Sequence, residues 1–341
     1  MLIPISIPAV RKQTTVTVGN NLSGMMETEG GLGGRVFLVI EEVVAGLYPE
    51  IKLSRPVSTL IIPSRGEALK TMETMCYILA WLRRQDVRRQ DRVMVAGGGA
   101  LLDVGSLAAS LFNRGLPTIL VPTTVVGQVD AAVGGKCAIN FGGIKNNVGQ
   151  FHFPLRVYCA TEVLSTLPLR HFWAGLGEVW KYCILWGLES LPREANKPGS
   201  ERFAALVGRC IQFKAKLVEE DPWDWNKRRW LNMGHTLGHA LEAADRNMLH
   251  GEAVLWGLEF ALRVSINRNL FNSCRGNRII ANLRSHPRPP LPNINFLRML
   301  QAMGEDKKNN SQLITMVLPG DENPIVAHCS FRQLFAAWHA L

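Results

Sequence analysis

The sequence predicts an α/β domain at residues 1–168 followed by a predominantly helical domain at residues 169–341. In the first half, short apolar runs alternate with helical patterns, which is typical of a largely parallel sheet with helices on both faces. After about Pro168, patterns with a 3.6-residue period dominate. A length of 341 residues also suits two domains of ordinary size.

Four segments of the first half are expected to be buried strands. They are Arg35–Glu41, Val57–Pro63, Arg92–Ala96 and Thr118–Pro122. Helical patterns lie between them, notably at Gly66–Arg84 and Leu101–Phe112. This alternation predicts the parallel sheet of the first domain.

The second half is expected to contain helices at Ala204–Glu220, Arg229–Asp245 and Glu252–Asn267. The Pro-rich segment His286–Pro292 is expected to be a surface loop, because helical sequence resumes after it. No internal repeat is evident. An active site is expected in the cleft between the two domains.

Composition narrows the functional classes. Apolar residues make up 47% of the chain and charged residues 19%, as in globular proteins. The start lacks a basic region, and no apolar stretch approaches the roughly 20 residues of a membrane span. Seven cysteines without a CxxC pair indicate free thiols. We therefore expect a cytoplasmic protein with no membrane partner.

The formal net charge of +10 admits nucleic acid as a partner. However, the Arg-rich segment Leu82–Arg92 interleaves acids and lacks aromatic residues, so a solvated helix end explains it better. A basic site for an anionic metabolite accounts for the surplus charge equally well. No nucleic-acid partner is expected.

A glycine turn at Gly97–Gly99 follows the third expected strand and precedes a helix that carries Asp103. Glycines let the backbone approach a pyrophosphate, and a helix N-terminus supplies free N–H groups, although a plain tight turn is the alternative. Glu41 and Glu42 end the first expected strand, where an acid can bind ribose hydroxyls and repel a 2′-phosphate. Alternatively, these two acids cap the N-terminus of a helix and bind no nucleotide. Together these features predict NAD rather than NADP.

The histidines of the second half suggest a metal site. His235 and His239 are four residues apart, so a helix would place both imidazoles on one face. His250 follows eleven residues later, and Glu178 lies upstream. Thr and Leu after His235 exclude the HExxH metalloprotease pattern. Two imidazoles and a carboxylate leave open positions on zinc, as catalysis requires, but spacing alone leaves metal binding and a structural role equally open.

A set of cations and amides accompanies these residues. It comprises Lys136, Lys145, Asn146, Lys181, Lys214, Arg228 and Asn232. Arg228, Asn232 and His235 are spaced by four and three residues, so one helix face is expected to carry all three. Each lysine alone would be a solvated surface charge. Cations gathered near a metal need a multiply anionic ligand, and a sugar phosphate with a carboxylate meets that need.

Seven short motifs, taken in order, resemble one known family. They are Pro122–Thr124, Gln128–Lys136, Lys145–Asn146, Thr166–Pro168, Gly177–Lys181, Leu231–His239 and Leu249–Ala253. From about Arg35 to Leu318, the chain resembles the 3-dehydroquinate synthase family of the sugar phosphate cyclase superfamily. The resemblance implies a Rossmann-like NAD-binding α/β domain and a C-terminal helical domain that binds metal and substrate. It also implies that Leu313–Leu318 forms a strand.

The resemblance further implies a role for each matching residue. Glu178, His235 and His250 would bind Zn²⁺, or Co²⁺ in its place. NAD would contact Glu41, Glu67, Lys70, Gly98, Gly99, Asp103, Thr123, Thr124, Asp130, Lys145 and Thr166. The substrate phosphate would lie among Lys136, Asn146, Lys181, His239 and one lysine of Asp306–Lys308. Lys214, Arg228 and Asn232 would hold the substrate carboxylate and ring hydroxyls. Arg114 would reach a neighbouring subunit's phosphate site, which implies a homodimer.

The implied enzyme is a carbon–oxygen lyase of the shikimate pathway. It would eliminate phosphate from 3-deoxy-D-arabino-heptulosonate 7-phosphate and close the ring to 3-dehydroquinate. The sequence departs from the family pattern at several positions, for example at Cys137 after Lys136. These departures keep a second function open, that of a secondary-metabolism cyclase that acts on an amino analogue of this substrate or on sedoheptulose 7-phosphate. A glycerol-dehydrogenase-type alcohol dehydrogenase is disfavoured by Glu178 and by the Lys145–Asn146 pair. A binding protein without catalysis is disfavoured by the complete catalytic set.

Overall fold

The computed structural model describes residues 1–7, 12–304 and 313–341. The chain forms two compact units. The first comprises Met1–Leu167 with Glu194–Trp223, and the second comprises Pro168–Arg193 with Asp224–Leu341. The first segment of the first unit ends at Leu167, next to the predicted domain boundary at Pro168. Glu194–Trp223, which the sequence assigns to the second domain, clusters with the first unit.

A seven-stranded sheet forms the centre of the first unit, in the order β1-β2-β9-β6-β5-β3-β4. The strands are β1 Leu2–Ile7, β2 Lys12–Gly19, β3 Val36–Glu41, β4 Ser58–Ile62, β5 Arg92–Gly97, β6 Thr118–Pro122 and β9 Arg156–Ala160. All neighbours pair in parallel except β1 with β2. The four strands that the sequence predicts are present, and β1, β2 and β9 are additional.

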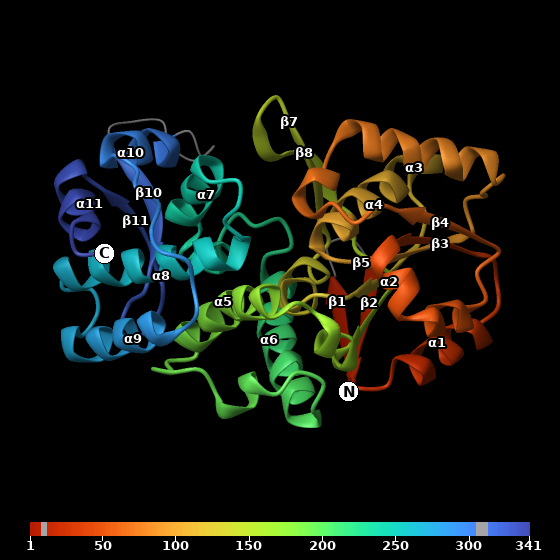
Figure 1. The fold of residues 1–341 in the computed structure, drawn as a ribbon, viewed down its shortest axis with the longest axis horizontal. Helices are drawn as coiled ribbons and strands as arrows, with labels where there is room; N and C mark the ends of the chain where they lie inside the picture. Colours follow the sequence, from red (N-terminus) through yellow and green to blue (C-terminus); the bar gives the residue numbers. More distant parts are fainter. Residues whose placement is uncertain (8–11, 305–312) are drawn as a thin grey trace. The chain divides into compact units, whose positions relative to one another are not determined.

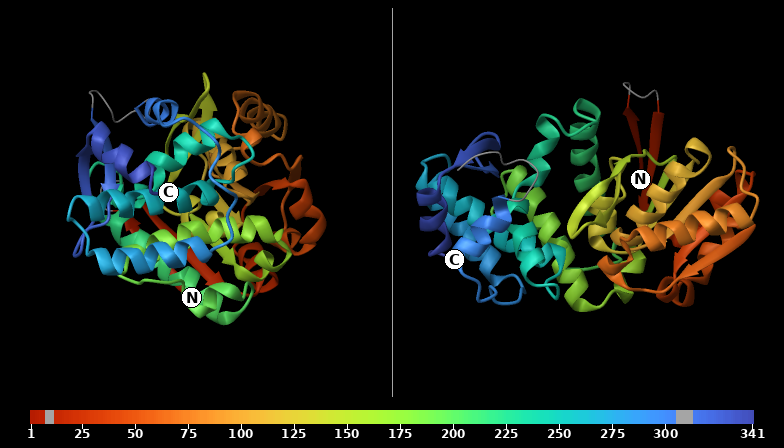
Figure 2. Two further views of the ribbon diagram at one scale, coloured as in Figure 1. Left: turned by 60° about the vertical axis from the view of Figure 1, so that its left-hand side comes forward. Right: turned by 90° about the horizontal axis from the view of Figure 1, so that it is seen from above.

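Helices lie on both sides of this sheet, with α3 and α4 on one side of β3 to β5 and α1 and α2 on the other (Figure 1; further views in Figure 2). The helices are α1 Leu22–Gly31, α2 Glu42–Leu47, α3 Met72–Arg84, α4 Gly99–Leu111 and α6 Glu201–Glu220. Short helical turns are η2 Pro49–Ser54, η3 Gly66–Leu69, η4 Phe112–Arg114, η5 Gly127–Ala131, η6 Thr161–Thr166 and η7 Arg193–Asn196. The helix predicted at Gly66–Arg84 is interrupted because Thr71 caps α3, its hydroxyl accepting from the N–H of Thr74.

A hairpin of β7 (Lys136–Phe141) and β8 (Ile144–Phe151) completes the first unit. Two glycines with positive φ, Gly142 and Gly143, form its turn, and Phe141 pairs with Ile144 across it. A two-residue glycine turn matches the right-handed twist of paired strands. The hairpin carries several of the predicted phosphate and cofactor residues.

The second unit is mainly helical. Its elements are α5 Leu169–Leu185, η8 Lys227–Asn232, α7 His235–Ala244, α8 His250–Asn267, α9 Ser273–Ser285, α10 Phe296–Gly304, α11 Phe331–Trp338 and the antiparallel pair β10 Ile314–Leu318 and β11 Ile325–Cys329. Leu241, Phe260, Met299, Leu318 and Leu334 are buried together in its core. The predicted fold class is therefore confirmed. Within the described part of the chain, none of the helices could cross a bilayer.

One predicted helix is wrong. The sequence predicts a single helix over Arg229–Asp245, but η8 ends at Asn232 and α7 begins only at His235. Gly234 adopts a left-handed conformation (φ 80°) between them, which breaks the helix. Arg228 and Asn232 therefore do not share a helix face with His235.

A buried carboxylate ties α8 to the Pro-rich loop that follows α9. Glu259 has no exposed surface, and its Oε1 lies 2.8 Å from Nη2 of Arg263 and of Arg284. Arg288, in the loop, binds the other oxygen, and its guanidinium lies 3.6 Å from the ring centroid of Trp256. Burial opposes the charge of Glu259, but the three guanidinium groups outweigh burial and lower the pKa of the carboxyl.

Candidate metal centre and nucleotide site

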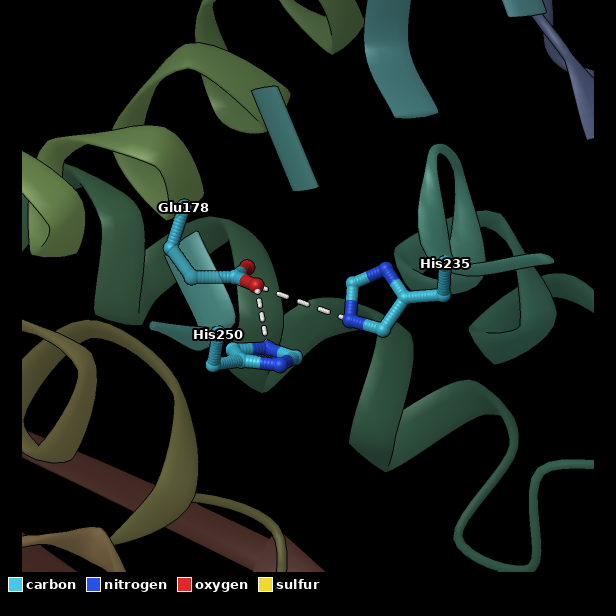
Figure 3. A group of neighbouring side chains, drawn as sticks. All are labelled: Glu178, His235 and His250. Carbon is cyan, nitrogen blue, oxygen red and sulfur yellow. Dashed lines mark hydrogen bonds and ion pairs between the residues drawn. The ribbon is translucent and has the colours of Figure 1, made fainter. Parts of the chain in front are cut away.

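Three side chains converge in the second unit (Figure 3). Glu178 lies on α5, and His235 and His250 are the first residues of α7 and α8. One ligand atom of each lies within 4.8 Å of the others. Nε2 of His250 is 3.0 Å and Nε2 of His235 is 3.5 Å from Oε1 of Glu178. The structure thus brings together the three residues that the sequence selects as zinc ligands.

Backbone contact between α5 and α8 sets the spacing of these ligands. A Cβ on Gly251 would lie 1.6 Å from the carbonyl oxygen of Ala174, and a Cβ on Gly177 would lie 2.3 Å from that of Gly251. Any side chain at either position would therefore push the helices apart. Because Glu178 and His250 adjoin these glycines in the chain, the crossing brings the carboxylate to the start of α8.

Each imidazole is held through its Nδ1 atom. Nδ1 of His235 lies 3.1 Å from the carbonyl oxygen of Met233, and Nδ1 of His250 lies 3.3 Å from the carboxylate of Glu242 on α7. Both rings therefore direct Nε2 towards Glu178. A histidine whose proton stays on Nδ1 presents the Nε2 lone pair, which is the form that binds a metal.

The charges of the centre suit a cation. Burial lowers the pKa of His235 to about 3, and the neighbouring Lys181 adds to the effect. Burial also opposes protonation of His250, but Glu242 and Glu178 outweigh it and raise the pKa of His250 to about 10. Two buried carboxylates thus stabilise a positive charge at this position. An N,N,O donor set with open positions fits catalytic zinc.

Two predicted substrate residues lie beside the metal centre. The ammonium group of Lys181 pairs with Glu178, one turn earlier on α5. The ring centroid of His239 lies 5.3 Å from that of His235 and 6.3 Å from that of His250. The structure therefore places a cation and a third imidazole around the three candidate ligands.

Arg228 and Asn232 lie in η8 of the same unit. The side chain of Arg228 is almost completely buried, with 1% of its surface exposed. The Nδ2 atom of Asn232 is buried and has no hydrogen-bond partner among the described residues. Since a buried polar group normally has a partner, this amide is suited to a ligand hydroxyl.

The carboxyl ends of the parallel strands gather residues predicted for NAD. Glu41 ends β3, and Gly97 ends the neighbouring strand β5. The N–H of Gly98 donates to the Glu41 carboxylate at 3.4 Å, and the N–H of Thr123 donates to the carbonyl of Gly97 at 3.0 Å. Burial raises the pKa of Glu41.

Two further residues predicted for NAD lie at the same edge of the sheet. Gly99 begins α4, and Thr124 follows Thr123 just after the end of β6. Ligands of open α/β sheets bind at this edge.

Lys70 links this edge to the β7–β8 hairpin. Its Nζ donates to Oδ2 of Asp103 at 2.6 Å and to Oδ1 of Asn146. Asn146 has a left-handed backbone (φ 52°), and its N–H donates to Oδ1 of Asn140 at 2.9 Å. The Asn140 amide in turn donates to Glu67 at 2.9 Å. Three predicted cofactor residues and one predicted phosphate residue thus belong to a single network.

Other predicted residues make different contacts. Nζ of Lys214, on α6, is 2.5 Å from Oδ1 of Asp130, so the predicted carboxylate cation pairs with a predicted NAD residue. The Thr166 hydroxyl is hydrogen bonded to the hydroxyl of Tyr48. Lys136 and Lys145 lie on β7 and β8, where Lys136 is exposed.

Arg114 is exposed at the end of η4, with φ 65°. This turn leads into the start of β6, so Arg114 lies at the amino edge of the sheet, opposite the edge that carries Glu41 and Gly98. The structure therefore separates Arg114 from the predicted NAD residues. The predicted lysine of Asp306–Lys308 lies outside the described residues.

Two residues at these sites are not among those that the sequence predicts. Glu242 contacts His250, and its position seven residues after His235, two turns along one helix face, could have revealed it. Asn140 bridges Glu67 and Asn146. The Gly142–Gly143 pair signals the hairpin that brings Asn140 and Asn146 together.

Fold and site together define a class of enzymes that combine a nucleotide-type parallel sheet with a helical, metal-binding part. Two family models narrow this class. Residues 60–174 match the N-terminal model of 3-dehydroquinate synthase, and residues 175–309 match its C-terminal model. The matches cover well over half of the chain, which therefore belongs to the 3-dehydroquinate synthase family.

One curated relative and two solved structures resemble this chain. A protein from Pelobacter propionicus described as 3-dehydroquinate synthase is 36% identical over 304 residues, which are 85% of this chain and 84% of that protein. The solved 2-epi-5-epi-valiolone synthase from Streptomyces hygroscopicus, with NAD⁺ and Zn²⁺ bound, is 26% identical, with a TM-score of 0.82 and 95% of each chain covered. A solved 2-deoxy-scyllo-inosose synthase shares the fold, with a TM-score of 0.84 at 22% identity and 98% of each chain covered.

Proposed function

We propose that this protein acts as a 3-dehydroquinate synthase on 3-deoxy-D-arabino-heptulosonate 7-phosphate. The observation that carries the proposal is Arg228, a guanidinium buried in the unit that holds the candidate metal centre. A guanidinium recognises a carboxylate through two parallel hydrogen bonds, and this substrate bears a carboxylate. The similarity to the Pelobacter propionicus protein supports the same assignment.

The cofactors of the proposed reaction are NAD and Zn²⁺, with Co²⁺ as an alternative ion. Glu178, His235 and His250 would hold the metal, and the edge of the sheet at Glu41 and Gly98 would hold NAD. Bound metal would acidify the substrate hydroxyl that is oxidised, and NAD would take up a hydride and return it. The NAD⁺ and Zn²⁺ of the solved valiolone synthase support this pair of cofactors.

The protein's own task would be to hold a multiply anionic substrate in one pose. Lys181, beside Glu178, would bring positive charge to the departing phosphate, and Lys136 and Asn146 on the hairpin would donate to its oxygens. The buried Nδ2 of Asn232 would bind a ring hydroxyl. Fixed donors of this kind lower a barrier by orientation and by stabilising charge as it develops.

We further infer a homodimer in the cytoplasm. Arg114 is exposed at the amino edge of its own sheet, which suits a residue that serves a neighbouring subunit. All seven cysteines are free thiols, as expected in a reducing compartment. The substrate is a small sugar phosphate, and neither nucleic acid nor a membrane is a proposed partner.

The direct test compares two substrates. Phosphate release should be faster with the heptulosonate phosphate than with sedoheptulose 7-phosphate, which lacks the carboxylate. A preference for sedoheptulose 7-phosphate would mean that Arg228 does not bind a substrate carboxylate. The function would then be that of a secondary-metabolism cyclase.

NAD should be needed only in catalytic amounts, because the hydride is returned within each turnover. With one equivalent of NAD per chain, phosphate release should continue through many turnovers while NADH absorbance stays flat. A steady rise of NADH in step with substrate consumption would instead identify an alcohol dehydrogenase.

Arg228→Lys should impair turnover of the carboxylate substrate. Lysine keeps the charge but cannot form the two parallel hydrogen bonds, and a lost charge-assisted contact costs about 2–3 kcal/mol, or roughly a 30- to 150-fold fall in kcat/KM. Zinc content and NAD affinity should stay close to those of the wild type. Arg229→Lys, the same change at the next position, is the matched control and should have little effect. An equal fall for both variants would contradict the role of Arg228.

A further inference from the structure

Glu242 touches the metal centre without belonging to the candidate ligand set. It lies on α7 with only 8% of its surface exposed, and its Oε2 is 3.3 Å from Nδ1 of His250. The ligand atoms that converge come from Glu178, His235 and His250. Since Nε2 of His250 faces Glu178, Glu242 stands behind the imidazole, on the side away from the ion position.

The two imidazoles differ in what holds them. His235 is largely buried, with 11% of its side chain exposed, and its Nδ1 faces a backbone carbonyl that no substitution removes. His250 has 32% of its side chain exposed, and its Nδ1 faces the Glu242 carboxylate. The ring of His250 therefore depends more on a side-chain contact.

The backbone of His250 is fixed by a different acid. Glu252 accepts from the N–H of Leu249 at 2.8 Å, which caps the start of α8, and Arg170 binds Glu252 through its Nε at 2.8 Å. These contacts set where the residue lies but leave rotation of the imidazole ring undetermined. Glu178 at Nε2 and Glu242 at Nδ1 both contact the ring, and since Glu178 would itself bind the metal, the contact with Glu242 is the one that orients the ring from outside the ligand set.

We propose that Glu242 is a positioning residue that sets the zinc affinity of the centre. It keeps the proton of His250 on Nδ1, turns Nε2 towards Glu178, and makes Nε2 a stronger donor through the negative charge behind the ring. The charge also offsets the positive end of the α8 dipole, which would weaken a donor at the first helical position. The inference rests on the proposed zinc but requires no particular substrate.

The test measures zinc affinity in metal-depleted protein by competition with a chelator of known affinity. Loss of such an outer hydrogen bond weakens metal binding by about 10- to 100-fold. Glu242→Gln, which keeps the shape and an acceptor but not the charge, should lie near the lower limit, and Glu242→Ala near the upper. Asp245→Asn removes the same charge from the end of the same helix, where the carboxylate accepts from the N–H of Asn247, and should change the affinity less than about twofold.

Two further measurements separate positioning from a merely structural role. The Co²⁺-substituted Glu242→Gln protein should show an altered visible spectrum, because the His250 ring is reoriented. Thermal unfolding of the metal-free Gln variant should match the wild type. Wild-type zinc affinity in both Glu242 variants, or a loss that only follows a lower unfolding temperature, would overturn the proposal. A wild type that binds zinc tightly but ignores the heptulosonate phosphate would refute the proposed function alone, whereas a wild type that binds no zinc would refute both.

Discussion

His250→Ala is expected to abolish turnover and stoichiometric zinc binding while leaving the chain folded. The structure offers three converging ligands, and removal of one leaves His235 and Glu178 to hold the ion with a single imidazole. Zinc measured by atomic emission should fall from about one per chain to a small fraction. The rate of phosphate release should fall at least about 1000-fold, which corresponds to about 4 kcal/mol.

His171→Ala is the matched control for this experiment. His171 lies on α5, as Glu178 does, but it is exposed, so its loss should leave zinc content and rate unchanged. Far-ultraviolet circular dichroism should show that the His250 variant retains its helices. Full zinc occupancy in His250→Ala, with the fold intact, would refute the assignment of this ligand.

Glu259→Gln should destabilise the second unit by about 3–5 kcal/mol at neutral pH, the usual cost of leaving one side of a buried ion pair without its partner. The substitution leaves three guanidinium groups around a neutral amide, and the side chain of Arg288 is only 6% exposed. Urea unfolding followed by tryptophan fluorescence should show the lower midpoint. Glu189→Gln, which also removes an arginine-paired carboxylate but at a more exposed position, should move the midpoint much less.

The effect of Glu259 should also depend on pH, with a definite sign. Because the arginines depress the pKa of Glu259 below its ordinary 4.5, the carboxylate stabilises the fold fully at pH values above 4.5. That contribution is lost as the pH falls through the depressed pKa, when the wild type also carries a neutral group. The difference in unfolding free energy between wild type and Glu259→Gln should therefore shrink in acid. A difference that is constant from neutral to strongly acidic pH would contradict the ion-pair explanation.

Much of the fold could be predicted from local patterns. Buried strands such as Arg92–Ala96 are continuous apolar runs between turn signals, and the structure contains them. The sequence does not predict β7 and β8, because these strands are half-exposed and polar and contain no continuous apolar run. The grouping of α6 with the first unit also has no local signal, since its contacts join segments distant in the chain.

The metal centre, too, depends on contacts between distant segments that local sequence patterns do not predict. The spacing of His235 and His239 suggested a pair on one face, yet the third converging ligand is His250, from the start of another helix. In the sequence, Gly234 is compatible with a position inside a helix or with a helix break. Only its left-handed backbone in the structure shows that the helix is broken there. Helical spacing places Glu242 on the same face as His235, but no local pattern indicates that His250 contacts it.

The crossing of α5 and α8 bears on which ion the centre selects. Gly177 and Gly251 place backbone against backbone, so the backbones that carry Glu178 and His250 can move apart only if the packed helices separate. Zinc forms bonds of about 2.0–2.2 Å to such ligands, whereas calcium requires about 2.3–2.6 Å and prefers more oxygen donors. Two imidazole nitrogens and one carboxylate oxygen at this crossing would therefore suit an ion of the zinc or cobalt type better than calcium.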